Sequence, residues 1–154
     1  MRRWILLVAL LALMGAACSS DSSSDGGEST TDTGPVESVE RCEELDPLVL
    51  DFLRSGLTVE ASLPWGFSVK SGDYNDVWIV TAAVEADVLA EAAYGTWAIR
   101  AGNWPSEYIG AVAVDEIAKQ ISSFGDEIDV IVSESTDGVM SAQACAIARI
   151  EAGG

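Results

Sequence analysis

The stretch Val77-Trp-Ile-Val-Thr-Ala-Ala-Val84 decides how this chain folds. Most of its residues are β-branched, and all but Thr81 are apolar. β-Branched side chains fit a pleated, buried strand better than they fit a helix. A short and nearly continuous apolar run of this kind is typical of a strand inside a sheet. We therefore expect residues 77–84 to form the central strand of the fold.

Weaker strand patterns surround this segment. Apolar residues alternate from Leu57 to Leu63, which is typical of a half-buried strand, and Pro64 ends the pattern. The same reasoning predicts further strands at Phe67–Val69, Thr96–Arg100, Tyr108–Val114 and, more weakly, Ile128–Val132. The sequence therefore predicts several short strands that follow one another along the chain.

Helical spacing of apolar residues marks both ends of the domain. Residues 36–54 predict one kinked helix or two short ones, with Asp46-Pro47 as N-cap and first helical residue. Asp115 is placed to cap an amphipathic helix that runs to Phe124. Thr136 or Asp137 opens a last helix through Ile150, and the alanine-rich residues 85–94 favour a short helix. The prediction is an α+β domain: a small antiparallel sheet with the N- and C-terminal helices packed on one face.

Length and charge limit the possible functions. The chain has 154 residues, which suggests one folded domain, and its 8 basic and 25 acidic residues give a net charge of −17. Such an excess of acids argues against nucleic acid as a partner, because phosphate binding needs clustered Lys and Arg. The chain has no histidine, so catalytic triads, proton shuttles and zinc sites built on imidazole are absent.

The N-terminus has the layout of a secretory signal peptide. Met1-Arg2-Arg3 is basic, and the apolar run Trp4–Met14 is too short to span a membrane. The following Gly15-Ala16-Ala17-Cys18 resembles the lipobox of bacterial lipoproteins, although this family usually has Leu where Gly15 stands. The resemblance implies cleavage before Cys18 and a lipid on its sulfur. The alternative is ordinary cleavage near Ala17, with Cys18 left as a thiol.

A polar segment separates Cys18 from the domain. Residues 19–34 are only Ser, Thr, Asp, Glu and Gly. A segment with nothing apolar to bury is expected to remain disordered, with a reach of roughly 20–25 Å. The predicted organisation is therefore a signal peptide (1–17), a lipidated cysteine with its tether (18–34) and an extracytoplasmic domain (35–154). The lipid anchor would hold that domain on the outer side of the cytoplasmic membrane.

The domain also resembles a group of actinobacterial secreted and membrane-anchored proteins that have no known activity. The likeness covers roughly residues 66–146, and its motifs are short. They are the run from Asp76 to Ala83, Gly95-Thr-Trp-Ala98, Ala113-Val-Asp115, Ala118-Lys119, Ser122-Ser123, Asp137-Gly138 and Ala144-Cys145. The resemblance implies a shared small extracytoplasmic domain and no particular reaction.

Two cysteines remain beside Cys18. Cys42 lies in the first helical segment and Cys145 in the last. Disulfides persist in exported proteins, so we expect a Cys42–Cys145 bridge that joins the two ends of the domain. Two free thiols are the alternative. A catalytic cysteine is the poorer interpretation, because no histidine is present to activate it.

Carboxylates are the main candidates for catalysis in a chain without histidine. Two acids can hydrolyse glycosides, and the candidate pairs are Asp73 with Asp76 and Asp115 with Glu116. Each pair also has an ordinary structural role, since Asp73 and Asp76 lie in a turn-like stretch and Asp115 at a helix start. No complete calcium loop, phosphate-binding loop or nucleophile elbow is present, so we expect neither a metal site nor a cofactor.

Two tryptophans are candidates for partner binding. Trp65 and Trp104 lie in turn-like sequences beside prolines, and a loop tryptophan can anchor an interface. The alternative is that each ring folds back over the edge of the core. Trp78 and Trp97 lie within predicted strands and are assigned to the core.

Together these observations predict a lipid-anchored binding or accessory module of the cell envelope, with an unknown envelope protein or glycan as partner. No catalytic activity is indicated. The alternative function is a carboxylate-based hydrolase of envelope glycans, and a third possibility is a surface protein with a purely structural role.

Overall fold

The computed structural model describes residues 39–89, 93–125 and 128–153. All of them belong to one unit, Gly34–Gly154. The predicted signal peptide, Cys18 and the tether lie outside the described residues. Within the described ranges, no helix is both long and apolar enough to cross a membrane.

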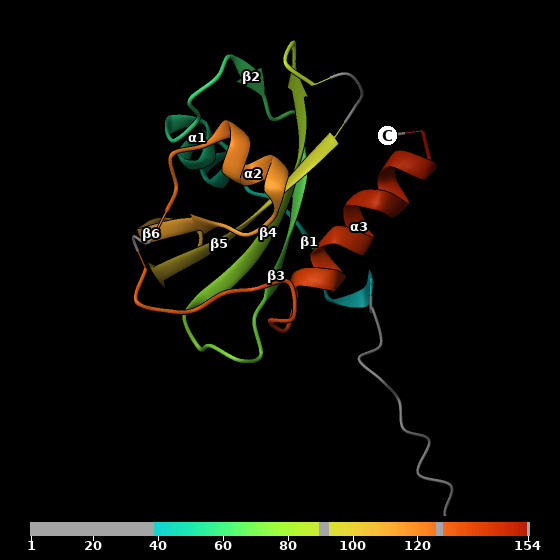
Figure 1. Ribbon diagram of the computed structural model, residues 1–154. Coiled ribbons are helices and arrows are strands. Elements are labelled where there is room, and N and C mark those ends of the chain that lie inside the picture. Colours follow the sequence, from blue (N-terminus) through green and yellow to red (C-terminus); the bar gives the residue numbers. More distant parts are fainter. Residues whose placement is uncertain (1–38, 90–92, 126–127, 154) are drawn as a thin grey trace, which may run out of the picture. The chain divides into compact units, whose positions relative to one another are not determined.

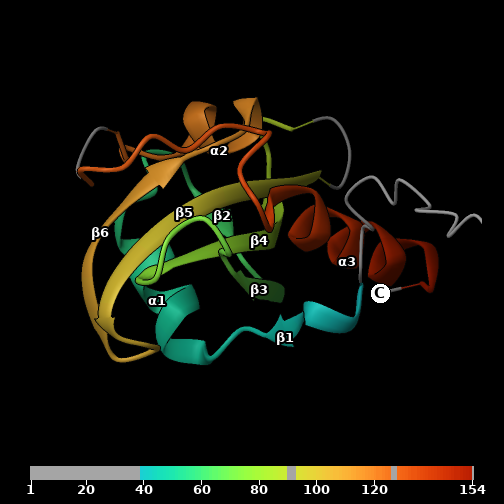
Figure 2. The same cartoon turned by 90° about the horizontal axis from the view of Figure 1, so that it is seen from below.

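An antiparallel sheet forms the centre of the domain (Figure 1). Its strands follow the order β1-β3-β4-β5-β6, and β2 pairs with the far end of β4. Figure 2 shows β5 and β6 bending around the side on which α1 lies. The bounds are β1 Glu43–Glu44, β2 Ala61–Ser62, β3 Gly66–Lys70, β4 Val77–Ala86, β5 Ala93–Asn103 and β6 Glu107–Ala113.

The predicted central strand is β4, and both of its faces are buried. Val77 and Ile79 belong to one apolar cluster, whereas Val80, Ala82 and Val84 belong to another. Successive side chains of a strand point to opposite faces of the sheet, so the two clusters lie on the two sides of β4. A strand that is apolar on both faces needs cover on both.

Within the described residues, this cover comes from α1 (Pro47–Ser55), α2 (Glu116–Ile121) and α3 (Val139–Glu151), and the short η1 (Val39–Arg41) lies against α3. The predicted caps are present, because Asp46 accepts a hydrogen bond from Leu48 N and Asp115 from Ala118 N, each at 2.8 Å. The last helix was predicted to open at Thr136 or Asp137, but its N-cap is Gly138, which has no side chain to cap it and whose φ of 95° favours glycine. The α+β class and the antiparallel sheet are confirmed.

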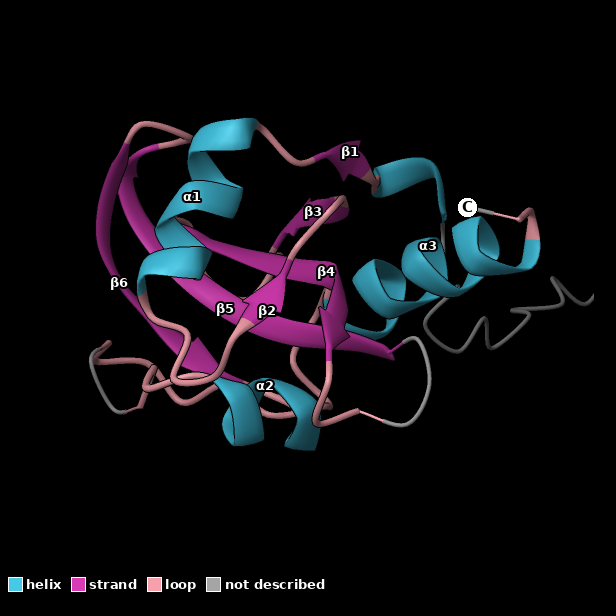
Figure 3. Ribbon diagram, turned by 90° about the horizontal axis from the view of Figure 1, so that it is seen from above, coloured by secondary structure: helices cyan, strands magenta, loops and turns pink. Residues whose placement is uncertain are grey.

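From the sequence we expected the N- and C-terminal helices to pack on one face of the sheet, but the structure places them on opposite faces. α1 and α2 contribute to the cluster around Val80 and Trp97, whereas α3 contributes Val139 and Ala142 to the cluster around Ile79. Figure 3 shows α3 apart from α1 and α2. The physical reason is the composition of β4, which would expose Ile79 and its neighbours if all helices packed on one side.

Three local predictions also differ from the structure. The alanine-rich segment 85–94 was expected to be helical, but β4 continues to Ala86 and β5 starts at Ala93. The long β4–β5 pairing, from Val77↔Arg100 to Val84↔Ala93, overrides the helix propensity of alanine. Residues 128–132 form no strand, and α2 ends at Ile121, before Phe124.

A disulfide joins Cys42 to Cys145, as predicted. It links the segment between η1 and β1 to α3, across 103 residues of sequence and a Cα–Cα distance of 6.5 Å. Two ion pairs span the same seam: Arg41 with Asp137 at 2.8 Å and Arg149 with Glu44 at 3.0 Å. The N-terminal segment of the domain is therefore tied to its C-terminal helix.

Replacing both cysteines tests this tie. We expect the Cys42→Ala/Cys145→Ala variant to lose about 2–4 kcal/mol of unfolding free energy, because a long covalent loop no longer restricts the unfolded chain. Chemical denaturation measures the difference. Reductant should lower the stability of the wild type and leave the double variant unchanged. Equal stability of the two proteins without reductant would contradict the expectation.

Candidate functional site

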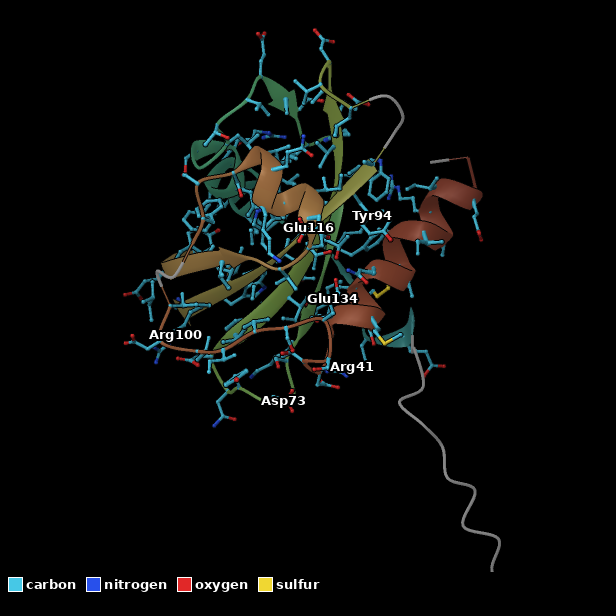
Figure 4. The ribbon with its side chains drawn as sticks, in the orientation of Figure 1. Arg41, Asp73, Tyr94, Arg100, Glu116 and Glu134 are labelled. Carbon is cyan, nitrogen blue, oxygen red and sulfur yellow. A yellow bond between two sulfur atoms is a disulfide. The ribbon has the colours of Figure 1, made fainter. Side chains whose placement is uncertain are left out.

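A cleft of about 380 Å³ lies where α3 meets the start of β5 and the start of α2. In Figure 4, Tyr94, Glu116 and Glu134 mark its three sides. Its lining comes from four segments far apart in the sequence, namely β5, α2 with its cap, the loop before α3, and α3 itself. The lining residues are Ala93, Tyr94, Asp115, Glu116, Ile117, Glu134, Gln143 and Ile150.

Asp115 is the unusual residue of the cleft. Its Oδ1 accepts the capping hydrogen bond from Ala118 N, whereas Oδ2 is buried. The hydroxyl and N–H of Thr96 lie near the carboxylate and stabilise its charge, but neither completes a hydrogen bond to Oδ2. Burial raises the pKa of the Asp115 carboxyl. The N–H of Ala118, the hydroxyl and N–H of Thr96 and the positive charge of Lys119 lower that pKa, but they offset the rise only in part. Buried polar atoms almost always have a partner, so an unpartnered carboxylate oxygen requires an explanation.

The charges around Asp115 are of one sign. Glu116 and Glu134 also line the cleft, and none of its described lining residues is basic. Lys119 lies outside the lining and pairs with Glu116 on the exposed side of α2 at 3.4 Å. The arrangement therefore concentrates negative charge at the mouth of a partly enclosed space.

The remaining walls are apolar or neutral. Tyr94, Ile117 and Ile150 supply apolar surface, and Gln143 is held in place by donating to Thr96 Oγ1 at 3.3 Å. Thr96 in turn shares a buried hydrogen bond with Thr81 at 3.1 Å. Chemically, this cleft can hold a positively charged group beside Asp115 and pack a short apolar chain against the isoleucines.

Asp73 and Asp76 do not form a pair. Asp76 Oδ2 accepts from Arg100 Nε at 2.7 Å, and the arginine lowers the pKa of that carboxyl. Asp73 Oδ2 accepts from the backbone N–H of Asp137 at 2.8 Å. Each carboxylate has its own structural partner, and neither lines the cleft. Asp115 and Glu116, by contrast, line it together.

The two candidate tryptophans pack against neighbouring rings. Trp104 stacks on Trp78 with ring centroids 4.9 Å apart and an interplanar angle of 3°. Trp65 meets Phe67 edge to face at 6.0 Å, and the Arg149 guanidinium lies 5.2 Å from its ring centroid. Both rings remain partly exposed, so a role in partner binding stays a prediction.

Three cleft residues gave no signal in the sequence. Tyr94 belonged to the alanine-rich segment that was expected to be helical, Glu134 lies in a loop, and Gln143 is one polar residue of an amphipathic helix. Only Asp115 and Glu116 were candidates. Among the residues that the structure describes, no group of three or more acids or cysteines is arranged to hold a metal ion.

Comparison with known proteins gives no match, whether to a protein family, to a curated protein or to a solved structure. The lipoprotein signal and the likeness to actinobacterial proteins therefore stay predictions, and the geometry of the cleft carries the functional argument.

Burial of the ionised Asp115 is unfavourable, so removing its charge by substitution should stabilise the protein. A raised pKa means that the ionised carboxylate destabilises the folded state above that pKa, and the penalty disappears as the pH falls towards the unfolded value. Asp115→Asn keeps the capping oxygen and removes the charge. We expect thermal unfolding to shift upward by about 2–4 °C at pH 7, with no difference at pH 3.

Asp137→Asn is the matched control with the opposite sign. Arg41 holds the pKa of Asp137 below its ordinary value, so the ionised group stabilises the fold above the unfolded pKa. We expect this variant to unfold at a lower temperature at pH 7 and to match the wild type at acidic pH. If Asp115→Asn behaved in the same way as Asp137→Asn, the account of an unpartnered Asp115 would be wrong.

Proposed function

We propose that the protein is a lipid-anchored binding module of the cell envelope, and that its cleft beside Asp115 receives a positively charged group of its ligand. The signal peptide, Cys18 and the polar tether in the sequence support the anchor. The single observation that supports the ligand class is the buried, unpartnered Oδ2 of Asp115 within an acidic cleft.

A bound cation would resolve the electrostatic cost of this carboxylate. A charge buried without a partner is unfavourable, and an opposite charge at hydrogen-bond distance restores the ionised form. An ammonium or guanidinium group can donate to Oδ2 while its other donors face Glu116 or Glu134. Oδ2 has almost no accessible surface in the free protein, so side chains at the mouth of the cleft must shift before the ligand can form this charge-assisted hydrogen bond.

The apolar walls of the cleft further restrict the chemical class of the ligand. Ile117, Ile150 and the ring of Tyr94 can cover an aliphatic chain attached to the charged group. A hydrated inorganic cation would leave these surfaces unused. A primary amine or guanidine on a short alkyl chain, such as a lysine or arginine side chain, is the chemistry that fits best. The acidic charge of the whole chain would also attract such ligands over longer distances.

An intact mass tests the anchor. Protein from the membrane fraction should have the mass of residues 18–154 plus acyl chains. It should gain two alkyl groups only when it is reduced before alkylation. A lipid-free product would overturn the anchor, and thiols that react without reduction would overturn the disulfide.

A titration with n-butylamine tests the ligand class. We expect saturable shifts of the Gln143 side-chain amide in NMR spectra, and binding weakened about tenfold or more in Asp115→Asn. Glu60→Gln removes an exposed acid outside the cleft and should bind like the wild type. Equal affinity of the Asp115→Asn variant and the wild type, or equal shifts with butyrate, would refute the cationic ligand.

One observation favours a second function. A carboxyl whose pKa is raised by burial can donate a proton, and Glu116 or Glu134 could supply the second acid of a glycan hydrolase. In that case cell-envelope glycans would be cleaved by the wild type and by Asp76→Asn, but not by Asp115→Asn. Absence of turnover across a broad glycan panel would leave binding as the function.

A further inference from the structure

A second hollow lies at the opposite edge of the sheet from β6. It has a volume of about 500 Å³ and shares no lining residue with the cleft beside Asp115. We call it the Trp78 groove. It is lined by Glu40, Arg41, Glu43, Lys70, Ser71 and Trp78, which come from η1, β1, the end of β3 and the start of β4.

Trp78 was assigned to the core from the sequence, but its indole is only partly buried and forms one wall of this groove. One side of the ring stacks on Trp104, which follows β5. Lys70 is the cross-strand partner of Trp78 on β3, so it approaches from the other side, with Nζ 5.4 Å from the ring centroid. Lys70 is exposed and flexible, and its movement would open that face of the indole to a ligand.

The Trp78 groove is lined by charges of both signs. Arg41 and Lys70 line it together with Glu40 and Glu43, although acids outnumber basic residues about threefold in the whole chain. Arg41 is oriented by a bidentate pair with Asp137, at 3.0 and 2.8 Å, and by the carbonyl of Lys70. No described residue forms an ion pair with Glu40 or Glu43, so their oxygens are available as acceptors.

We infer that the Trp78 groove binds an uncharged saccharide. The C–H face of a pyranose ring packs on an indole, and its hydroxyls both donate and accept hydrogen bonds. Glu40 and Glu43 provide acceptors, whereas Lys70 and Arg41 provide donors. An anionic ligand would meet repulsion from Glu40 and Glu43 and a cationic ligand from Lys70, whereas a purely apolar ligand would offer no hydrogen bond to any of the three. This inference goes beyond the proposed function and does not depend on the lipid anchor or on Asp115.

Titration with neutral oligosaccharides tests the inference on the full-length protein. The probes are chitotetraose, cellotetraose and maltotetraose. At least one should shift the indole N–H signal of Trp78 in a saturable manner. Trp78→Leu should weaken that binding about tenfold or more, because a buried tryptophan contact is lost. Phe124→Leu, which changes a partly exposed ring outside the groove, should leave the affinity unchanged.

A second variant keeps the test decisive if Trp78→Leu does not fold. Glu43→Ala removes an exposed acceptor of the groove and should weaken binding severalfold, whereas Glu107→Ala on β6 should have no effect. Asp115→Asn should also bind the saccharide normally, which separates this result from the test of the cleft. No binding of any neutral probe, or equal affinity of the Glu43→Ala variant and the wild type, would overturn the inference.

Discussion

The burial of β4 on both faces is the constraint on which the rest of the structure depends. Val80, Ala82 and Val84 need cover on one side, and α1 and α2 provide it. Val77 and Ile79 need cover on the other, and α3 provides it from the end of the chain. α3 covers this face without the other described α-helices. The Cys42–Cys145 bridge and the flanking ion pairs attach it further to the N-terminal segment of the domain. The acidic cleft lies where α3, α2 and β5 meet.

The sequence predicted most of what depends on local pattern. The apolar run at residues 77–84, the caps at Asp46 and Asp115 and the pairing of Cys42 with Cys145 are each encoded within a few residues. Prediction failed where the tertiary environment decides. Residues 85–94 joined a long hairpin despite their alanines, and the placement of helices on both faces followed from the whole sheet. The cleft was hidden because Tyr94, Glu134 and Gln143 come from three separate segments.

The carboxylates separate into two electrostatic classes that carry the functional argument. Asp76 and Asp137 have lowered pKa values because each is paired with an arginine, and such pairs hold the fold together. Asp115 has a raised pKa because burial disfavours its charged form more than Ala118, Thr96 and Lys119 stabilise it. Natural proteins retain an unfavourable group of this kind where function needs it, as at ligand-binding and catalytic sites. The Trp78 groove differs again, since charges of both signs surround an aromatic surface.

The most direct test of the central claim is a measurement of the Asp115 carboxyl itself. An NMR titration of its side-chain carbon gives the pKa of this group in the free protein and in the presence of n-butylamine. We expect a pKa above 3.8, the ordinary value of an aspartate, in the free protein, and a clear fall when the amine is bound. A pKa at or below the ordinary value that the amine does not change would show that Asp115 is only a helix cap.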